Sequence, residues 1–211
     1  MVRAVRSKRI ARQPKPHLYP PGHIKIVEAL RSLLMEKDFN AITWSDIAQT
    51  AGVNEGLIYK YFKDKRNLLH KVLEAYFKEY LAKLENDLKG IDGTLNKLRK
   101  LIWSVINASN EDRVFAKIIF LEVRNFPGYF ESQSYRLVKD YAKMIKELIE
   151  EGIRTGEIRK DISPWHLRQI ILGSIEHLCL PGVIFNQEIN PDALTEELCK
   201  ILLTNIGIHR H

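Results

Sequence analysis

The chain has 211 residues, of which 45% are hydrophobic and 28% charged, the composition of an ordinary globular protein rather than a disordered one. No apolar run approaches the ~20 residues of a membrane-spanning helix, and the basic N-terminus lacks the apolar stretch of a secretory signal, so we expect a cytoplasmic protein without membrane contact. Two cysteines are too few for a disulfide framework or a four-cysteine metal site, and we predict no metal and no cofactor.

The net charge of +7 is unevenly placed along the chain. The whole excess of Lys and Arg lies within residues 1–89, and the first 15 residues hold six basic side chains and no acidic one. Residues 1–22 are also rich in proline, so we predict a flexible basic arm there. Such an arm is typical of a protein that binds a polyanion, although a solubilising tail has the same composition, and the sequence leaves open whether the arm touches DNA.

Helical periodicity recurs along the rest of the chain, which predicts an all-α fold of about nine helices. The predicted helices cover residues 23–37, 43–51, 55–61, 64–89, 94–109, 113–125, 132–153, 163–180 and 191–206. Ser163 and Pro164 suit the start of a helix, and we expect Pro181 and Gly182 to end it.

The segment 43–62 has the pattern of a helix, a tight turn and a second helix. Thr43 and Asp46 form the sequence of a capping box, Gly52 suits a left-handed turn, and Asn54 is a good N-cap for the second helix. This pattern predicts a helix-turn-helix, which lays its second helix in the DNA major groove. An ordinary helical hairpin with a glycine turn has the same pattern.

The second helix of this motif is short, so only its first turns can reach DNA. The residues that it offers are Asn54, Glu55, Gly56, Leu57, Tyr59, Lys60 and Tyr61. Gly56 permits a close backbone approach, and Tyr59, Lys60 and Tyr61 can reach phosphates and base edges. Glu55 either accepts a hydrogen bond from a cytosine amine or points away from the phosphates.

Residues 26–69 resemble the DNA-binding domain of the TetR family of transcriptional regulators. The matching positions follow the family's spacing without a gap and are Ile26, Ala29, Leu33, Glu36, Lys37, Phe39, Thr43, Asp46, Ile47, Ala48, Ala51, Gly52, Val53, Gly56, Ile58, Tyr59, Tyr61, Phe62, Lys65, Leu68 and Leu69. Asp38 departs from the pattern, because the family usually has Gly at this end of the first helix.

The resemblance implies a homodimeric regulator, a repressor that a small apolar or amphipathic effector releases from a palindromic operator. It implies that residues 23–69 form the DNA-binding domain, with a fourth helix continuing to about residue 89. Residues 90–211 would form the ligand-binding and dimerisation domain.

The resemblance also implies roles for single residues. Tyr59 and Tyr61 correspond to paired aromatic residues that contact DNA. Thr43 and Lys65 correspond to residues that bind phosphates, which suits helix N-termini because their free amides attract anions.

The helices after residue 90 are rich in large apolar side chains, which pack a core and can also surround an apolar ligand. The candidate pocket residues are Trp103, Asn107, Phe115, Ile119, Phe120, Arg124, Phe126, Tyr141, Met144 and His177. Glu122 and Glu176 are further polar groups that could orient a ligand. Residues 121–162 loosely resemble the subgroup of the family that controls fatty-acid degradation and senses acyl-CoA thioesters, which implies an acyl-chain effector.

The last two predicted helices resemble the family's dimerisation pair, and two such pairs would form a four-helix bundle across a two-fold axis. The candidate interface residues are Leu167, Ile170, Ile171, Ser174, Ile175, Leu178, Leu194, Leu198, Ile201, Leu202 and Asn205. Part of each apolar stripe must instead face its own domain.

Two other functions compete with a ligand-responsive regulator. A helical enzyme is not expected, because the sequence has no phosphate-binding loop, hydrolase or dinucleotide motif and its histidines lack metal-ligand spacing. A DNA-binding protein controlled by a protein partner, or by nothing, would lack an apolar cavity in the second domain.

Overall fold

The computed structural model describes residues 19–207, and nine α-helices form in this part of the chain, which confirms the all-α prediction. The helices are α1 (Pro21–Leu34), α2 (Trp44–Ala51), α3 (Glu55–Tyr61), α4 (Lys65–Leu88), α5 (Thr94–Glu111), α6 (Arg113–Lys117), α7 (Gln133–Thr155), α8 (Pro164–Phe185) and α9 (Pro191–Leu202). A π-helical turn (Ile118–Glu122) and two 3-10 turns (Val123–Asn125 and Pro127–Glu131) connect α6 to α7.

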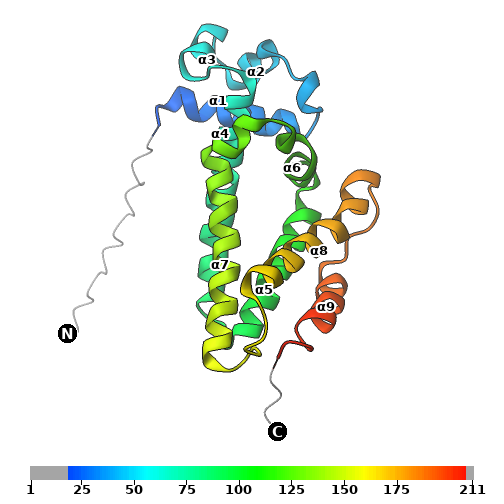
Figure 1. Cartoon of the computed structure of the whole chain (residues 1–211). Coiled ribbons are helices and arrows are strands. Elements are labelled where there is room, and N and C mark those ends of the chain that lie inside the picture. The colour runs from blue at the N-terminus through cyan, green and yellow to red at the C-terminus, as the bar shows by residue number, and fades with distance from the viewer. Residues whose placement is uncertain (1–18, 208–211) are drawn as a thin grey trace, which may run out of the picture.

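The helices form a small head and a larger body (Figure 1). The head consists of α1, α2 and α3, which lie at one end of α4. In the body, α4 runs along α7, and α5 packs against α7, α8 and α9. Helix α4 therefore belongs to both parts and carries the head on its N-terminal end.

The first helix begins two residues earlier than expected. Pro21 occupies its first turn, where the missing amide costs no hydrogen bond, so residues 21 and 22 belong to α1 rather than to an arm. At Gly22 a Cβ would lie 3.0 Å from Leu57 Cδ2, so glycine lets the start of α1 approach α3 closely. The rest of the predicted arm, residues 1–18, lies outside the described residues.

The prediction that α8 ends at Pro181 and Gly182 is wrong, because the helix continues to Phe185 and ends at Asn186 in a left-handed conformation with φ 54°. Tertiary contacts hold this last turn. The Arg113 guanidinium donates to the carbonyl oxygens of Gly182 (3.2 Å) and Gln187 (2.9 Å) and to Asn186 Oδ1 (2.8 Å). These charged hydrogen bonds satisfy acceptors at the helix end beyond Pro181.

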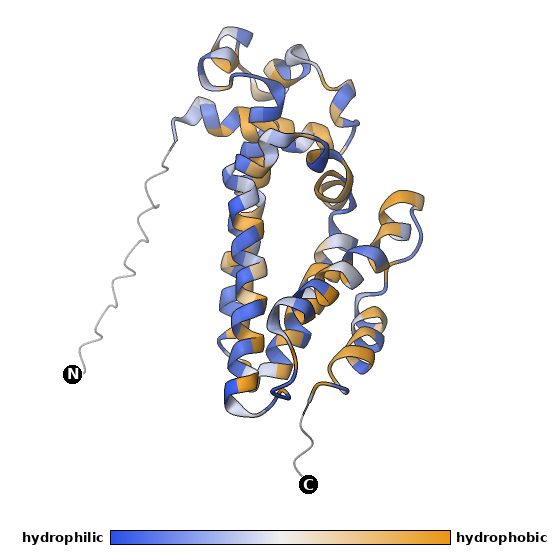
Figure 2. Ribbon diagram, in the orientation of Figure 1, coloured by the Kyte–Doolittle hydropathy of each residue, from blue (hydrophilic) through white to orange (hydrophobic). Residues whose placement is uncertain are grey.

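Helix α8 is also long and apolar enough to cross a membrane by length and composition, contrary to the expectation that no such segment exists. One helix of this kind is weak evidence of a membrane span. Its residues divide between two faces at helical spacing: Leu167, Ile171 and Ile175 are buried in the protomer, whereas Ile170 and Leu178 are exposed. Figure 2 shows the apolar end of α8 projecting from the body.

Residues 113–131, which we call the wall segment, form a bent run of short helices instead of the single helix predicted over 113–125. Phe115, Ile118, Val123 and Tyr129 of this segment are buried in the same hydrophobic cluster as the core of the head. A second cluster fills the space between α5, α7, α8 and α9. The wall segment is thus packed against the head although it belongs to the second half of the sequence.

Candidate DNA-binding interface and effector pocket

The first helix of the helix-turn-helix begins with the predicted capping box. The Asp46 amide donates to Thr43 Oγ1 (3.1 Å), and the Asp46 carboxylate accepts from the Thr43 amide (2.8 Å) and hydroxyl (2.9 Å). Gly52 closes the helix with φ 64°, a conformation that favours glycine. These local interactions fix the angle at which the chain enters and leaves α2.

The second helix, α3, presents only part of its predicted surface to solvent. Asn54 Oδ1 accepts from the Leu57 amide (2.9 Å), which caps α3 as expected. Five of the predicted DNA-binding residues in this stretch are exposed, namely Asn54, Glu55, Gly56, Tyr59 and Lys60. The Leu57 side chain is half-buried against Gly22, and Tyr61 is half-buried with its ring edge against His23 at 5.7 Å.

Lys65, at the start of α4, has partners that its position in the sequence does not reveal. Its ammonium donates to the carbonyl oxygens of Ile42 (2.6 Å) and Phe39 (2.9 Å) and lies 4.7 Å from the centroid of the Phe39 ring. Partial burial and the neighbouring charge of Arg66 lower the pKa of Lys65. The side chain therefore fastens α4 to the loop before α2.

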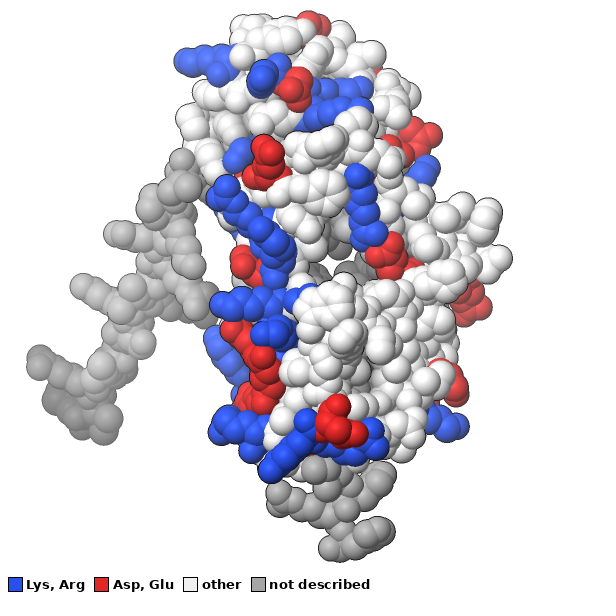
Figure 3. All heavy atoms as spheres, viewed as in Figure 1, with Lys and Arg blue, Asp and Glu red and all other residues white. Residues whose placement is uncertain are grey.

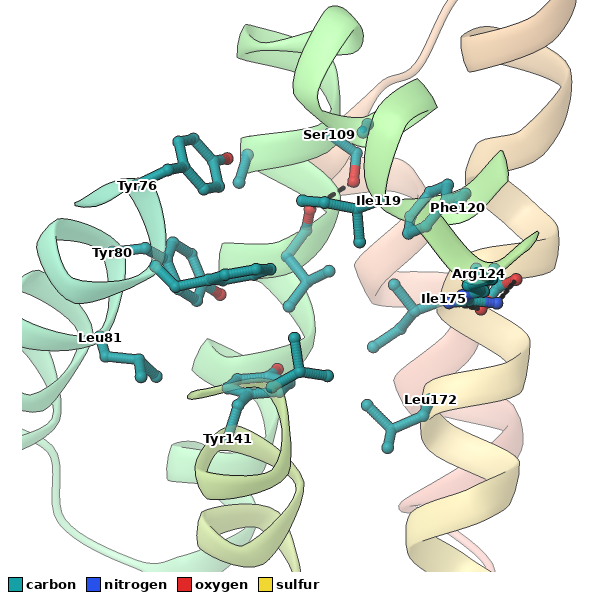
Figure 4. Close-up of a pocket in the computed structure, with 16 residues that line it drawn as sticks. Tyr76, Tyr80, Leu81, Ser109, Ile119, Phe120, Arg124, Tyr141, Leu172 and Ile175 are labelled. Carbon is teal, nitrogen blue, oxygen red and sulfur yellow. Dashed lines mark hydrogen bonds and ion pairs between the residues drawn. The ribbon is translucent and has the colours of Figure 1, made fainter. Parts of the chain in front are cut away.

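A cavity of about 190 Å³ lies in the body between α4, α5, the wall segment, α7 and α8 (Figure 4). Aromatic and aliphatic side chains form most of its surface. The lining residues are Tyr76, Phe77, Tyr80, Leu81, Val105, Ala108, Ser109, Ala116, Ile119, Phe120, Arg124, Val138, Tyr141, Leu172, Ile175 and Glu176.

Several polar groups of this cavity are already bound within the protein. Tyr80 accepts from the Ser104 hydroxyl (3.0 Å), the Tyr141 hydroxyl donates to the Leu101 carbonyl (3.3 Å), and the Ser109 hydroxyl donates to a backbone carbonyl of its own helix. Burial raises the pKa of Tyr80 and Tyr141 well above the usual value for tyrosine, so both stay uncharged at neutral pH. The cavity is therefore suited to an apolar ligand.

Arg124 and Glu176 are the two charged residues among those that line the cavity. Arg124 Nη1 donates to Glu176 Oε1 (2.6 Å), and Nη2 donates to Oε2 (2.8 Å), in a bidentate ion pair between the wall segment and α8. Their side chains are 43% and 31% exposed, so the pair lies where the cavity meets solvent.

Four of the ten predicted pocket residues line the cavity, namely Ile119, Phe120, Arg124 and Tyr141. The other six do not line it. Phe115 is buried and stacks on Tyr76 with 4.6 Å between ring centroids, and the Trp103 indole donates to Asp192. Asn107 and Met144 are half-buried elsewhere, Phe126 lies under the Arg66 guanidinium, and His177 is exposed.

The prediction missed the contribution of α4, whose side chains Tyr76, Phe77, Tyr80 and Leu81 form one wall of the cavity. The spacing of these residues in the sequence already places their large side chains on one face of the helix, but it does not tell what that face contacts. A helix that is needed to connect two domains gives no sequence signal that its middle also lines a pocket.

The predicted dimer residues divide between the core and the surface. Leu167, Ile171, Ile175 and Leu198 are at most 5% exposed, so their assignment to an interface is wrong and they belong to the protomer's own core. Ile170, Leu178 and Ile201 are 50%, 38% and 62% exposed. The remaining candidates are half-buried or exposed, namely Ser174, Leu194, Leu202 and Asn205. The structure adds two exposed apolar residues at the C-terminal end of α8, Ile184 and Phe185.

A helix-turn-helix with an exposed second helix, carried on a helical body with an apolar cavity, defines a DNA-binding regulator with a ligand-binding domain. Residues 26–72 match the profile of bacterial regulatory proteins of the tetR family, and residues 73–205 match that of the YsiA-like protein C-terminal region. The chain belongs to the TetR family of transcriptional regulators.

Relatives with established roles cover nearly the whole chain. The fatty acid metabolism regulator protein of Bacillus subtilis is 26% identical over 189 residues, which cover 90% of this chain and 96% of the relative. The crystal structure of the transcriptional regulator FadR from Bacillus subtilis in complex with stearoyl-CoA has a TM-score of 0.77 at 26% identity and covers 89% of this chain and 100% of that one. FadR from Bacillus halodurans has the same fold, with a TM-score of 0.76 at 22% identity over 89% of this chain and 97% of that one.

The capping box predicts a pH-dependent stability. The Thr43 backbone amide, then the Thr43 hydroxyl and Lys37, hold the pKa of Asp46 at about 2, below its usual value. Because the folded-state pKa is lowered, ionised Asp46 stabilises the fold above the unfolded-state pKa of about 4, and this contribution is lost as pH falls toward 2. Asp46→Asn should therefore lower the urea midpoint at neutral pH, and its difference from wild type should shrink as the pH falls below about 4.

Asp161→Asn is the matched control, because Asp161 is an exposed carboxylate far from the head in sequence that pairs with Arg159. A difference between wild type and Asp46→Asn that stays constant from neutral pH to about pH 3 would show that the box does not depend on the carboxylate charge.

Proposed function

We propose that this protein is a homodimeric repressor that binds a palindromic operator and leaves it when an acyl-chain effector, of the acyl-CoA thioester class, enters the body. The observation that carries the proposal is the apolar cavity lined by the middle of α4, the helix whose first residue is fastened to the head. A DNA-binding protein controlled by a protein partner has no need of such a cavity. The relative solved with stearoyl-CoA supports the effector class. An operator-binding role places the protein in the cytoplasm.

The DNA-binding surface is the exposed side of the predicted domain, residues 23–69. Tyr59 is 55% exposed and lies beside Trp44, with 5.5 Å between their rings, so the two aromatic groups stand together at the motif. Lys60 supplies a positive charge on α3, and Thr43 stands at the N-terminus of α2, where free amides favour a phosphate. Leu57 acts mainly by packing α3 against α1, and Lys65 can contact phosphate only while it also holds the loop before α2.

The dimer interface is the exposed apolar face of α8 and α9. Charged side chains gather on the α7 side of the molecule, whereas the surface over α8 carries few of them (Figure 3). Ile170, Leu178 and Ile201 project from this face, and the absence of a side chain at Gly173 leaves open space for a neighbouring helix. Two copies related by a two-fold axis would bury this face and set the two heads about 34–36 Å apart, the period of the major groove.

The volume of the cavity supplies the coupling between effector and DNA. About 190 Å³ is less than the roughly 300–1,000 Å³ of typical ligand pockets, so a long acyl chain must push the walls apart. Two of those walls are α4 and the wall segment, and both pack in the same hydrophobic cluster as the head. The effector thus binds an arrangement with a wider cavity and a displaced head better than the arrangement that fits DNA, which is the condition for release.

The DNA-docking proposal is tested by removing single charges. Lys60→Ala should weaken binding to operator and random DNA and alter sequence preference. It should also lower the slope of log affinity against log salt concentration by about one per head. Lys65→Ala should weaken binding to all sequences with a similar change of slope, and it should also lower the melting temperature because its two short carbonyl contacts are lost. Affinities are measured across salt concentrations, with Lys143→Ala on α7 as the control. Unchanged affinity in both head variants would show that the head docks differently.

The dimer proposal is tested with a charge on each helix of the interface. The double variant Ile170→Glu, Ile201→Glu should sediment as a monomer and lose most of its operator affinity, because burying two unpaired carboxylates is costly. Met35→Glu is the control, since Met35 is 55% exposed at the end of α1. A double variant that stays dimeric would place the interface elsewhere.

The effector proposal is tested by filling the cavity. An acyl-CoA should lower operator affinity of the wild type by about 5–150-fold, the usual range for coupled sites. Ile119→Trp should blunt this response and leave binding without effector unchanged, because the indole occupies space in the cavity. The control is Leu88→Trp, at the far end of α4. An equal response of both variants would place the pocket elsewhere, and tighter DNA binding with effector would reverse the sign of regulation.

A further inference from the structure

The ion pair at the rim of the cavity is electrically neutral as a whole, and this affects which acyl compounds the cavity can bind. Arg124 and Glu176 together carry no net charge, and they are the two charged residues of the lining. A ligand whose apolar chain fills the cavity must bring its polar end near one side of the lining, and this pair is the most polar part of it.

The Arg124 guanidinium has five N–H donors, and the bidentate contact with Glu176 uses two of them. The remaining donors can bind a neutral carbonyl oxygen without breaking the ion pair. A free carboxylate binds weakly at this position. The charge of Arg124 is already balanced, and the Glu176 carboxylate repels a second anion beside it.

We propose that Glu176 is a specificity-determining residue that admits neutral acyl carbonyls, such as the thioester of an acyl-CoA, and rejects free fatty acids. Arg124 is the donor to the acyl carbonyl, and Glu176 acts by repulsion and by keeping Arg124 neutralised. Selection against the wrong ligand by an unfavourable charge is a common source of specificity. This inference rests on the proposed function, since it concerns the ligand of the same cavity.

The other polar side chains of the lining are the uncharged hydroxyls of Tyr76, Tyr80, Ser109 and Tyr141, so Arg124 is the one cation among the lining residues. The hydroxyls of Tyr141 and Ser109 donate to backbone carbonyls, whereas Tyr80 accepts from Ser104 and can still donate, but a neutral hydroxyl does not balance the charge of a carboxylate. An ionised carboxylate placed deeper in the cavity would be a buried charge without a cationic partner, which is strongly unfavourable. Arg124 is therefore the position at which an acid and a thioester are distinguished.

The test compares three ligands that share one chain: lauroyl-CoA, the neutral thioester lauroyl-N-acetylcysteamine, and laurate, which is ionised at neutral pH. Release of operator DNA is titrated with each ligand for wild type and for Glu176→Gln. Glu147→Gln on α7 is the matched control, because it removes a similar charge in an exposed ion pair. The neutral thioester separates the effect of Glu176 on the acyl carbonyl from its effect on the phosphates of coenzyme A.

Wild type should respond to both thioesters and at least about tenfold more weakly to laurate. Glu176→Gln should lower the laurate concentration for half-release by about tenfold or more and change the response to lauroyl-N-acetylcysteamine by less than about threefold. The double variant Arg124→Gln, Glu176→Gln should lose the gained response to laurate, because the gain depends on the freed guanidinium.

The outcomes separate this inference from the proposed function. If neither thioester releases operator DNA from the wild type, the proposed effector class is wrong. If wild type responds to the thioesters but Glu176→Gln still ignores laurate, or if wild type responds equally to laurate, the role of Glu176 is wrong. A response to laurate that persists in the double variant would also overturn it, because Arg124 would then not be the group that binds the polar end.

Discussion

The apolar contact between the wall segment and the head holds the two halves of this protein together. Phe115 of the wall segment is fully buried and stacks on Tyr76 of α4, inside the same cluster that contains Ile26 and Leu30 of α1. Burial of one phenylalanine contributes about 1.5–3 kcal/mol, whereas an exposed ion pair such as Lys117 with Asp38 contributes about 0–1 kcal/mol. The hydrophobic contact therefore contributes more than the ion pair to holding the head in its position on the body.

This arrangement gives the cavity two physical links to the DNA-binding surface. One link is α4, which lines the cavity with Tyr76 and Tyr80 and reaches the head at Lys65. The other is the wall segment, which lines the cavity with Ile119 and Phe120 on its π-helical turn and packs against the head with Phe115. A π-helical turn is a local departure from regular helix that often occurs at functional sites. Separation of these walls by a ligand would therefore act on the head from two sides.

The chemistry of the cavity follows from how its polar groups are satisfied. Tyr80, Tyr141 and Ser109 would be poor neighbours for an acyl chain if their hydroxyls were free, since an unpaired polar group in an apolar site is costly. Each is bound to another group of the protein. The ligand then meets rings and methyl groups along most of its length, and a charged pair at one end. That division matches an amphipathic molecule better than a wholly apolar or wholly polar one.

The sequence by itself determined the features that depend on neighbouring residues. The capping box of Thr43 and Asp46, the left-handed turn at Gly52 and the cap at Asn54 are local hydrogen-bonding and backbone preferences, and the family spacing around them identified the helix-turn-helix. Only the tertiary structure decided which face of the apolar helix α8 lies inside, because Leu167 and Ile170 have the same hydropathic character and differ only in what packs against them. It likewise placed Arg113 against the end of α8, which carries the helix past Pro181, and brought α4 to the cavity. Such contacts join residues far apart in the chain, and periodicity along a single helix holds no information about its distant partners.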